Sequence, residues 1–323
     1  MTATAPATSA ASSSRADLFA GPDDLLASAL KADTGPGDAP ALGNGEPAGE
    51  NVEPTLALQD AGAEPRKVLG YDFALGKVQT VVMGFTTSVK QEGARGGGGD
   101  MPPLRLTLSV VASDRPSPDR TLFEARVTKA EIPPGTKGVP ADVAAEMGEL
   151  SKTLASIGAT LLVSKRGIIE EVNFSGDPEA QNAASTILSL LEEAFGLFFV
   201  PVPEEAVGEG AQWTMTGETP PGMPRGALSK TYSLKARTPA TATVHVELAE
   251  QAPEQPIQDP ESPPGATIAV AGKETTTLTV RLAGIASKAA SDAETVITTR
   301  DPSTSPPSVA VTHMKRGQRL DAP

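Results

Sequence analysis

The sequence predicts an α+β protein, mainly antiparallel β, with one strongly curved sheet or open barrel of about ten strands wrapped on two central helices. In Leu104–Val110 apolar and polar residues alternate without interruption, and the same period of two returns in at least six other segments. Successive side chains of a strand point to opposite faces, so this period indicates a sheet with one dry and one solvated face. Such half-solvated sheets are antiparallel, because parallel sheets are covered on both faces. A two-sheet sandwich is the alternative.

Alternating segments place the expected strands along the chain. Three of them, Gln79–Val89, Leu104–Val110 and Thr121–Lys129, are expected to form a meander. A hairpin is expected at Thr160–Ser164 and Ile168–Phe174. The later strands are expected at Leu228–Lys235, Thr241–Leu248, Thr276–Leu282 and Ser308–Met314, with two more near Gly265 and Ala293.

Two segments in the middle of the chain have the period of a helix instead. In Ala141–Ile157 apolar residues follow at intervals of four and three, which is typical of a helix with one buried face. Pro140 precedes this segment and Gly158 follows it, as is common at helix ends. A second helix is expected from Asp177, a good N-cap residue that Pro178 follows in the first turn. These two helices are the expected cover for the dry face of the sheet.

Composition divides the chain into a tail and one domain. Residues 1–65 contain ten acidic and two basic residues, which is −8 of the net charge of −13, and they are rich in Ala, Pro, Gly and Ser. A segment with so few large apolar groups is expected to be disordered. Within it, Pro22–Leu30 is interpreted as a transient helix rather than a docking motif. Ten of the eleven aromatic residues lie from Tyr71 to Tyr232, so residues 66–323 are expected to form a single β-rich domain.

The composition also excludes several classes of function. Lys and Arg are not clustered on this acidic chain, so nucleic acid is not an expected partner. The chain has no cysteine, which excludes disulfides and thiolate metal sites. No apolar run approaches the length of about 20 residues that a membrane span needs. The first residues show neither the basic start nor the apolar middle of an export signal.

Residues that could carry catalysis or hold a cofactor are sparse. Of the two histidines, His245 shares its strand face with polar residues, and no acidic residue lies within five positions of His313. Adjacent glutamates project in different directions, so pairs such as Glu192 and Glu193 are interpreted as solvated surface. The glycines at 96–99 lack the Gly-Lys-Ser/Thr sequence of a phosphate-binding loop. We therefore expect no catalytic residue, no cofactor, no metal and no enzymatic activity.

What remains is a set of large apolar side chains on the predicted helices and the later strands. They are interpreted as core residues, with a ligand cavity between helices and sheet as the functional alternative. The candidate ligand-lining residues are Met147, Leu150, Leu154, Ile187, Leu190, Leu191, Phe198, Trp213 and Tyr232.

Three stretches carry a resemblance to a known type of protein. They are YDFALGKVQTVVM (Tyr71–Met83), LLVSKRGIIEEVNF (Leu161–Phe174) and PVPEEAVGEGAQWTM (Pro201–Met215). Together they resemble an uncharacterised family of bacterial envelope proteins, similar to the periplasmic lipoprotein carriers of the open β-barrel type, over residues 66–320. The resemblance implies an exported protein, outside the cytoplasm, whose curved sheet shelters acyl chains.

Two functions are expected from these observations. The first is non-enzymatic binding of a lipid or other apolar ligand between the helices and the sheet, in the bacterial cell envelope. The alternative is a structural or protein-interaction module of the envelope without a ligand cavity. A filled interior and an exposed apolar patch favour the second, and an apolar cavity above about 300 Å³ favours the first.

Overall fold

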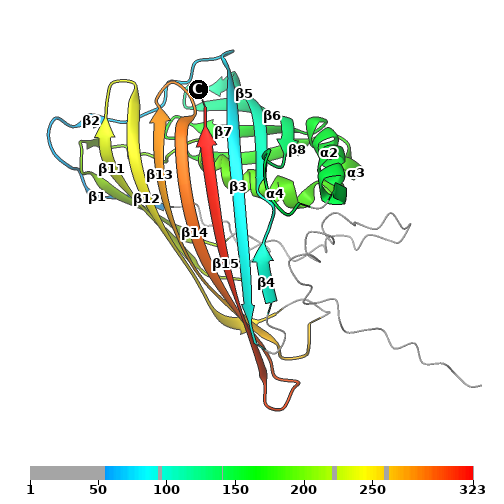
Figure 1. Ribbon diagram of the computed structural model, residues 1–323. Helices are drawn as coiled ribbons and strands as arrows, with labels where there is room; N and C mark the ends of the chain where they lie inside the picture. The colour runs from blue at the N-terminus through cyan, green and yellow to red at the C-terminus, as the bar shows by residue number, and fades with distance from the viewer. Residues whose placement is uncertain (1–54, 94–96, 140, 220–223, 258–261, 323) are drawn as a thin grey trace, which may run out of the picture.

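The computed structural model describes residues 55–93, 97–139, 141–219, 224–257 and 262–322 (Figure 1). The described part is mainly antiparallel β, with one sheet of 13 strands, a second sheet of two strands and a few short helices. The expected antiparallel sheet is confirmed, and it has more strands than expected. The segment Pro22–Leu30 lies outside the described residues.

The large sheet runs in the order β1, β10, β11, β12, β13, β14, β15, β3, β5, β6, β7 and β8, with β4 beside β3. In that order the strands are Thr55–Asp60, Gln212–Glu218, Ala227–Arg237, Thr241–Pro256, Thr267–Arg281, Ala286–Asp301, Ser308–Asp321, Val78–Glu92, Leu104–Ser117, Arg120–Glu131, Gly158–Ser164 and Ile169–Ser175, with β4 at Gly97–Asp100. The short strands β2 (Lys67–Val68) and β9 (Ala206–Val207) pair with each other. Strands β1 and β8 end the path of described strands, and β1 lies inside the range that composition assigns to the tail.

The helices form largely where their sequence period predicts them. Helix α2 spans Ala141–Ala155. The second expected helix is divided into α3 (Pro178–Ala183) and α4 (Ser185–Phe195) at Ala184, which has a ψ of 6°. The Asp177 side chain caps α3 as expected, since it accepts a hydrogen bond from the Glu179 amide nitrogen at 3.1 Å.

The helices lie beside β5–β8, at one end of the strand order (Figure 1). Short connections explain this position, because β7 begins three residues after α2 and α3 begins three residues after β8. The segment Leu197–Val202 runs over the neighbouring part of the sheet. The amide nitrogen of Ala286 in β14 donates to the Phe198 carbonyl oxygen of this segment at 2.8 Å.

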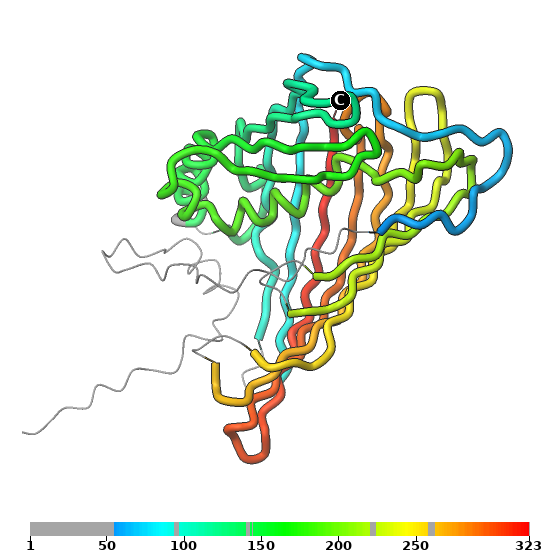
Figure 2. Tube along the Cα trace, turned by 180° about the vertical axis from the view of Figure 1, so that it is seen from behind, coloured from blue at the N-terminus to red at the C-terminus, as the bar shows by residue number. Residues whose placement is uncertain are grey.

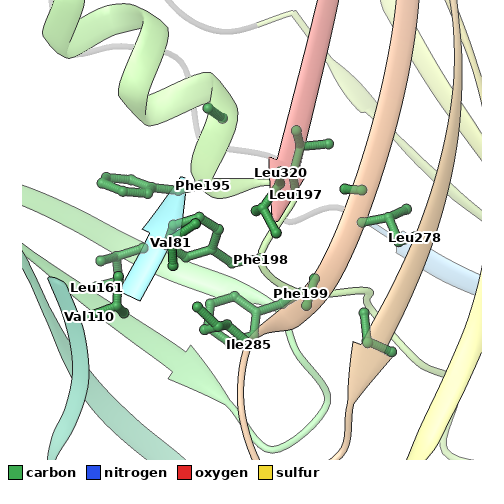
Figure 3. Close-up of a cluster of buried hydrophobic side chains, with 14 of the residues drawn as sticks. Val81, Val110, Leu161, Phe195, Leu197, Phe198, Phe199, Leu278, Ile285 and Leu320 are labelled. Carbon is green, nitrogen blue, oxygen red and sulfur yellow. The ribbon is translucent and has the colours of Figure 1, made fainter. Parts of the chain in front are cut away.

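One face of the large sheet packs against the helices and the segment Leu197–Val202, and we call it the core face. Its strands alternate buried apolar residues with more exposed polar ones, as in Val81, Met83 and Phe85 of β3. Side chains from distant strands meet there around Phe198 and Phe199 (Figure 3). The core face is therefore the dry face that the period of two predicts.

Strands β3 and β11–β15 continue beyond this core toward the far tip of the molecule (Figures 1 and 2). We call this part the sheet extension, and it consists of residues 86–92, 227–231, 247–256, 267–275, 292–301 and 308–317. Three of its stretches, 247–256, 292–301 and 308–317, have ten residues each and span about 34 Å at the usual rise per residue of a strand. A row of buried polar side chains on the core face, Thr276, Ser291 and Gln318, separates the extension from the core.

Candidate functional site

A narrow apolar crevice lies between the helices and the sheet, where the sequence predicts a ligand cavity. Its volume is about 10 Å³, which is at the lower limit for a single water molecule. Apart from Gly158, every residue that lines it has an apolar side chain. The apolar residues are Leu108, Ala125, Val127, Leu154, Ile157, Ala159, Phe174, Leu188, Leu191 and Phe195. Side chains therefore fill this space in the present conformation.

The structure divides the nine candidate ligand-lining residues into two groups. Five are buried in the core, namely Leu154, Leu191, Phe198, Trp213 and Tyr232. Four are half-buried and pack against the core, namely Met147, Leu150, Ile187 and Leu190. Only Leu154 and Leu191 reach the crevice.

Sequence reasoning missed two residues of α4 that line the crevice, Leu188 and Phe195. Together with Leu191 they follow at intervals of three and four, which marks a single helix face. The stripe chosen from the sequence, with Ile187 and Leu190, lies on the neighbouring side of the same helix. The true stripe was thus visible in the sequence one position further along.

The segment Leu197–Val202 is fixed by an aromatic cluster. Phe199 lies in edge-to-face contact with Tyr71 and Phe73, with ring centroids 6.0 Å and 5.5 Å apart. Further along the sheet, Trp213 stacks on Tyr232 at 5.7 Å, and its indole nitrogen donates to the Pro201 carbonyl oxygen at 2.8 Å. Contacts between aromatic rings stabilise a fold beyond what the burial of their apolar area contributes. These rings are therefore packing residues in this conformation.

Both tyrosines are buried, and burial is the main cause that raises the pKa of each phenol above its usual value. For Tyr71, a hydrogen bond with Val200 opposes this effect in part. For Tyr232, the nearby Glu274 carboxylate raises the pKa further. Each phenol is therefore protonated at neutral pH.

The three stretches that carry the envelope-protein resemblance meet at one point. Gly167 has a φ of +75°, and a Cβ atom there would lie 2.5 Å from the Tyr71 ring and 2.6 Å from the Val200 carbonyl oxygen. Beside it, the Arg166 side chain donates to the Val202 carbonyl oxygen at 3.0 Å and to Glu204 at 2.8 Å. The residues that carry the resemblance therefore include a tightly packed structural junction.

Within the described part of the chain, the histidines and carboxylates form no compact cluster. His245 Nδ1 lies 3.3 Å from the Thr277 hydroxyl and Nε2 lies 3.6 Å from Glu247, on the solvated face of the sheet. His313 lies on the same face, in the sheet extension. Among the described residues, no group of three or more His, Asp or Glu side chains could hold a metal ion. No helix of the described chain is long and apolar enough to span a membrane.

A larger hollow, of about 610 Å³, lies on the face opposite the core face, over β3 and β13–β15. Its charged side chains largely compensate one another. Lys273 lies 3.1 Å from Glu294, and Lys315 lies 3.8 Å from the same carboxylate. The hydrogen bond from Lys273 is the main cause that holds the pKa of Glu294 below its usual value. The hollow is open, many of its lining residues carry charged or hydroxyl groups, and they come from strands far apart in the sequence.

The row of buried polar side chains is tied to helix α4 and to the extension. Glu274 accepts hydrogen bonds from Ser291 at 2.5 Å and from Thr276 at 2.8 Å. Glu193 of α4 accepts from Arg316 at 2.6 Å and from Gln318 at 3.5 Å. All three buried side chains of the polar row thus have a hydrogen-bond partner. The row marks where the core ends.

Beyond the polar row, apolar side chains appear again on the core face of the extension. None of them belongs to the core cluster or packs against it. We call this surface the extension face, and its apolar members include Val89, Leu228, Leu248, Ile268, Ile297 and Met314. Its sequence signal is weak because aliphatic residues such as Val296 and Val311 also occur on the opposite face.

Comparison with known proteins adds no family or relative. No protein-family model matches the chain, and no curated protein matches it. Inferences about function therefore depend on the residues and their arrangement.

Proposed function

We propose that the protein is a non-enzymatic interaction module of the bacterial cell envelope, and that it binds a partner protein through the extension face. The observation that carries this proposal is the contrast between a filled crevice and a second apolar surface outside the core. The apolar side chains of the extension face are half-buried, and apolar surface that is left outside a core is typical of binding sites. The assignment to the envelope rests on the sequence resemblance alone.

We further propose that the sheet bends around α2, α4 and the segment Leu197–Val202, as the sequence predicts. Residues from distant places in the strand order support this. Leu161 of β7 and Trp213 of β10, which are separated by eight strands along the path, belong to one core cluster. A flat sheet of this width would keep such residues far apart, because neighbouring strands are about 4.8 Å apart.

Position-specific crosslinking tests the interaction function. A photoreactive residue at Ile297 faces the proposed partner, and one at Thr298 points to the opposite side of the same strand. In the native cells, we expect crosslinked products of higher mass from position 297 and not from position 298. Equal yields at both positions, or none at either, would contradict the proposal.

A second candidate function is binding of a lipid or other apolar ligand in the crevice. It is favoured by the apolar lining, to which Leu154 and Leu191 contribute. Because a crevice of about 10 Å³ holds no acyl chain, α4 must move away from the sheet when a ligand binds. Native mass spectrometry of gently purified protein tests this function, since a bound ligand adds a discrete mass and an unliganded spectrum excludes it.

A further inference from the structure

We propose that the partner on the extension face is a second copy of this chain, bound through the same face about a two-fold axis. This inference rests on the proposed function, since it names the partner for that surface. In a two-fold interface each residue pair occurs twice, so one chain must carry both halves of every contact. The extension face meets this condition in its charge, its apolar rows and its size.

Charge complementarity is the first argument. Lys230 in β11 and Glu250 in β12 lie on the extension face in adjacent rows, because Lys230 is opposite Leu248 and Leu228 is opposite Glu250. Both are half-buried, and neither forms an ion pair with another described residue. A second copy across a two-fold axis can place its Glu250 on Lys230 and its Lys230 on Glu250. The same contact then satisfies all four charges.

The other charges on this face do not oppose association. Arg316 is paired with Glu193 of α4, and Glu274 is hydrogen-bonded within the polar row. By register Asp301 also belongs to this face, which therefore carries two basic groups, Lys230 and Arg316, and three acidic groups, Glu250, Glu274 and Asp301. Its net charge is −1, although the chain has a net charge of −13. Approach through this nearly neutral surface keeps the acidic remainder of the two copies apart.

The apolar rows and their area provide the second argument. Half-buried apolar side chains lie in successive rows across the strands of this face. Met314 and Val89 are paired in one row, and Ile297 lies one row further toward the tip. The 51 residues of the extension, at about 3.4 Å each along strands about 4.8 Å apart, cover about 830 Å² per copy. A stable dimer buries about 800 Å² per partner. Two sheets packed face to face about 10 Å apart would thus form an interface of ordinary size.

Charge-reversal variants of the full chain test this pairing. Lys230→Glu places two glutamates at each contact of a homodimer, and Glu250→Lys places two lysines there. Each variant alone is expected to weaken dimerisation at least tenfold in sedimentation experiments. An equimolar mixture of the two is expected to restore the dimer, because every contact then joins a glutamate to a lysine. A structural change within each variant chain cannot restore the dimer when the two variants are mixed.

Apolar variants provide a matched control. Ile297→Asp is expected to abolish the dimer, whereas Thr298→Asp, on the opposite face of the same strand, is expected to leave it intact. Circular dichroism and thermal unfolding of each variant separate loss of association from loss of folding. Equal effects of both variants, or no rescue in the mixture, would overturn the inference.

The remaining outcomes separate this inference from the proposed function. If the wild-type chain is monomeric at about 50 μM, which is above the dissociation constant of an ordinary stable interface, the second copy is excluded. If position 297 still crosslinks to another protein, the interaction function stands with a different partner. If the monomer dimerises only after residues 1–54 are removed, those residues compete for the face and the inference fails as well.

Discussion

The Tyr71 hydroxyl accepts a hydrogen bond from the Val200 amide nitrogen at 2.8 Å and lies 3.3 Å from the Val200 carbonyl oxygen, to which it donates. These residues are 129 positions apart in the sequence. The contact joins the segment that leads into β3 to the segment Leu197–Val202, over the aromatic part of the core. Because Tyr71 is buried, water cannot replace either hydrogen bond.

Replacing Tyr71→Phe is therefore expected to lower the free energy of unfolding by about 1–3 kcal/mol, because it leaves the Val200 amide group without its partner. Urea unfolding followed by tryptophan fluorescence measures the change. Tyr232→Phe is the matched control, since the Tyr232 hydroxyl makes no hydrogen bond with the described residues. A loss as large for Tyr232→Phe would show that the hydroxyl contact with Val200 is not the cause.

The buried phenols of Tyr71 and Tyr232 are expected to make the folded protein less stable at alkaline pH. Burial is the main cause that raises their pKa values in the folded protein above the value of about 10 that is usual for a phenol. The folded state therefore holds the phenol proton more tightly than the unfolded state does. Stability is expected to be complete below pH 10 and to fall as the pH rises further, because the unfolded chain then gains by ionising. Urea midpoints between pH 8 and pH 11 measure this, and the decline is expected to be smaller in Tyr71→Phe.

Two glycines have similar backbone conformations but different surroundings. Replacing each with alanine separates the cost of backbone strain from the cost of steric overlap. Gly167 and Gly76 have φ angles of +75° and +73°. A Cβ atom at Gly167 would overlap Tyr71 and Val200, whereas one at Gly76 would meet nothing within 4 Å. Gly76→Ala is expected to cost about 1 kcal/mol for its left-handed conformation alone.

Gly167→Ala carries the same conformational cost and also displaces the junction of Tyr71 with Val200. It is expected to destabilise the fold by about 3 kcal/mol or more, as overpacking and backbone strain add. Thermal unfolding of both variants gives the comparison. Equal losses would mean that the junction adapts to the extra atom.

The sequence predicted the elements whose signal is local. The intervals of four and three in Ala141–Ile157 predicted α2, and Asp177 with Pro178 predicted the start of α3. The alternation in Leu104–Val110 predicted both β5 and its buried face. In each case the residues that decide the structure lie within one or two turns or pleats of one another.

Features that depend on distant partners were not predicted. Strand β1 lies in a segment of tail-like composition, and it forms because Leu56 and Leu58 pair along β10. The length of the extension was missed because its strands carry aliphatic residues on both faces, as Val296 and Ile297 show. The crevice was predicted as a space between helices and sheet, but its closure depends on side chains from four strands and two helices.

Two leucines of α2 differ in how much they contribute to closing the crevice. Leu154 is fully buried and lines the crevice, while Leu150, one turn earlier, is only half-buried. Leu154→Ala is expected to cost about 3 kcal/mol, because it removes buried methyl groups and leaves a cavity, and Leu150→Ala is expected to cost about half as much or less. The enlarged crevice of Leu154→Ala is also expected to bind benzene, since dry cavities with an apolar lining accept such ligands. Benzene should therefore raise the unfolding temperature of Leu154→Ala and not that of Leu150→Ala. Equal shifts in the two variants would mean that α2 collapses onto the sheet and refills the space.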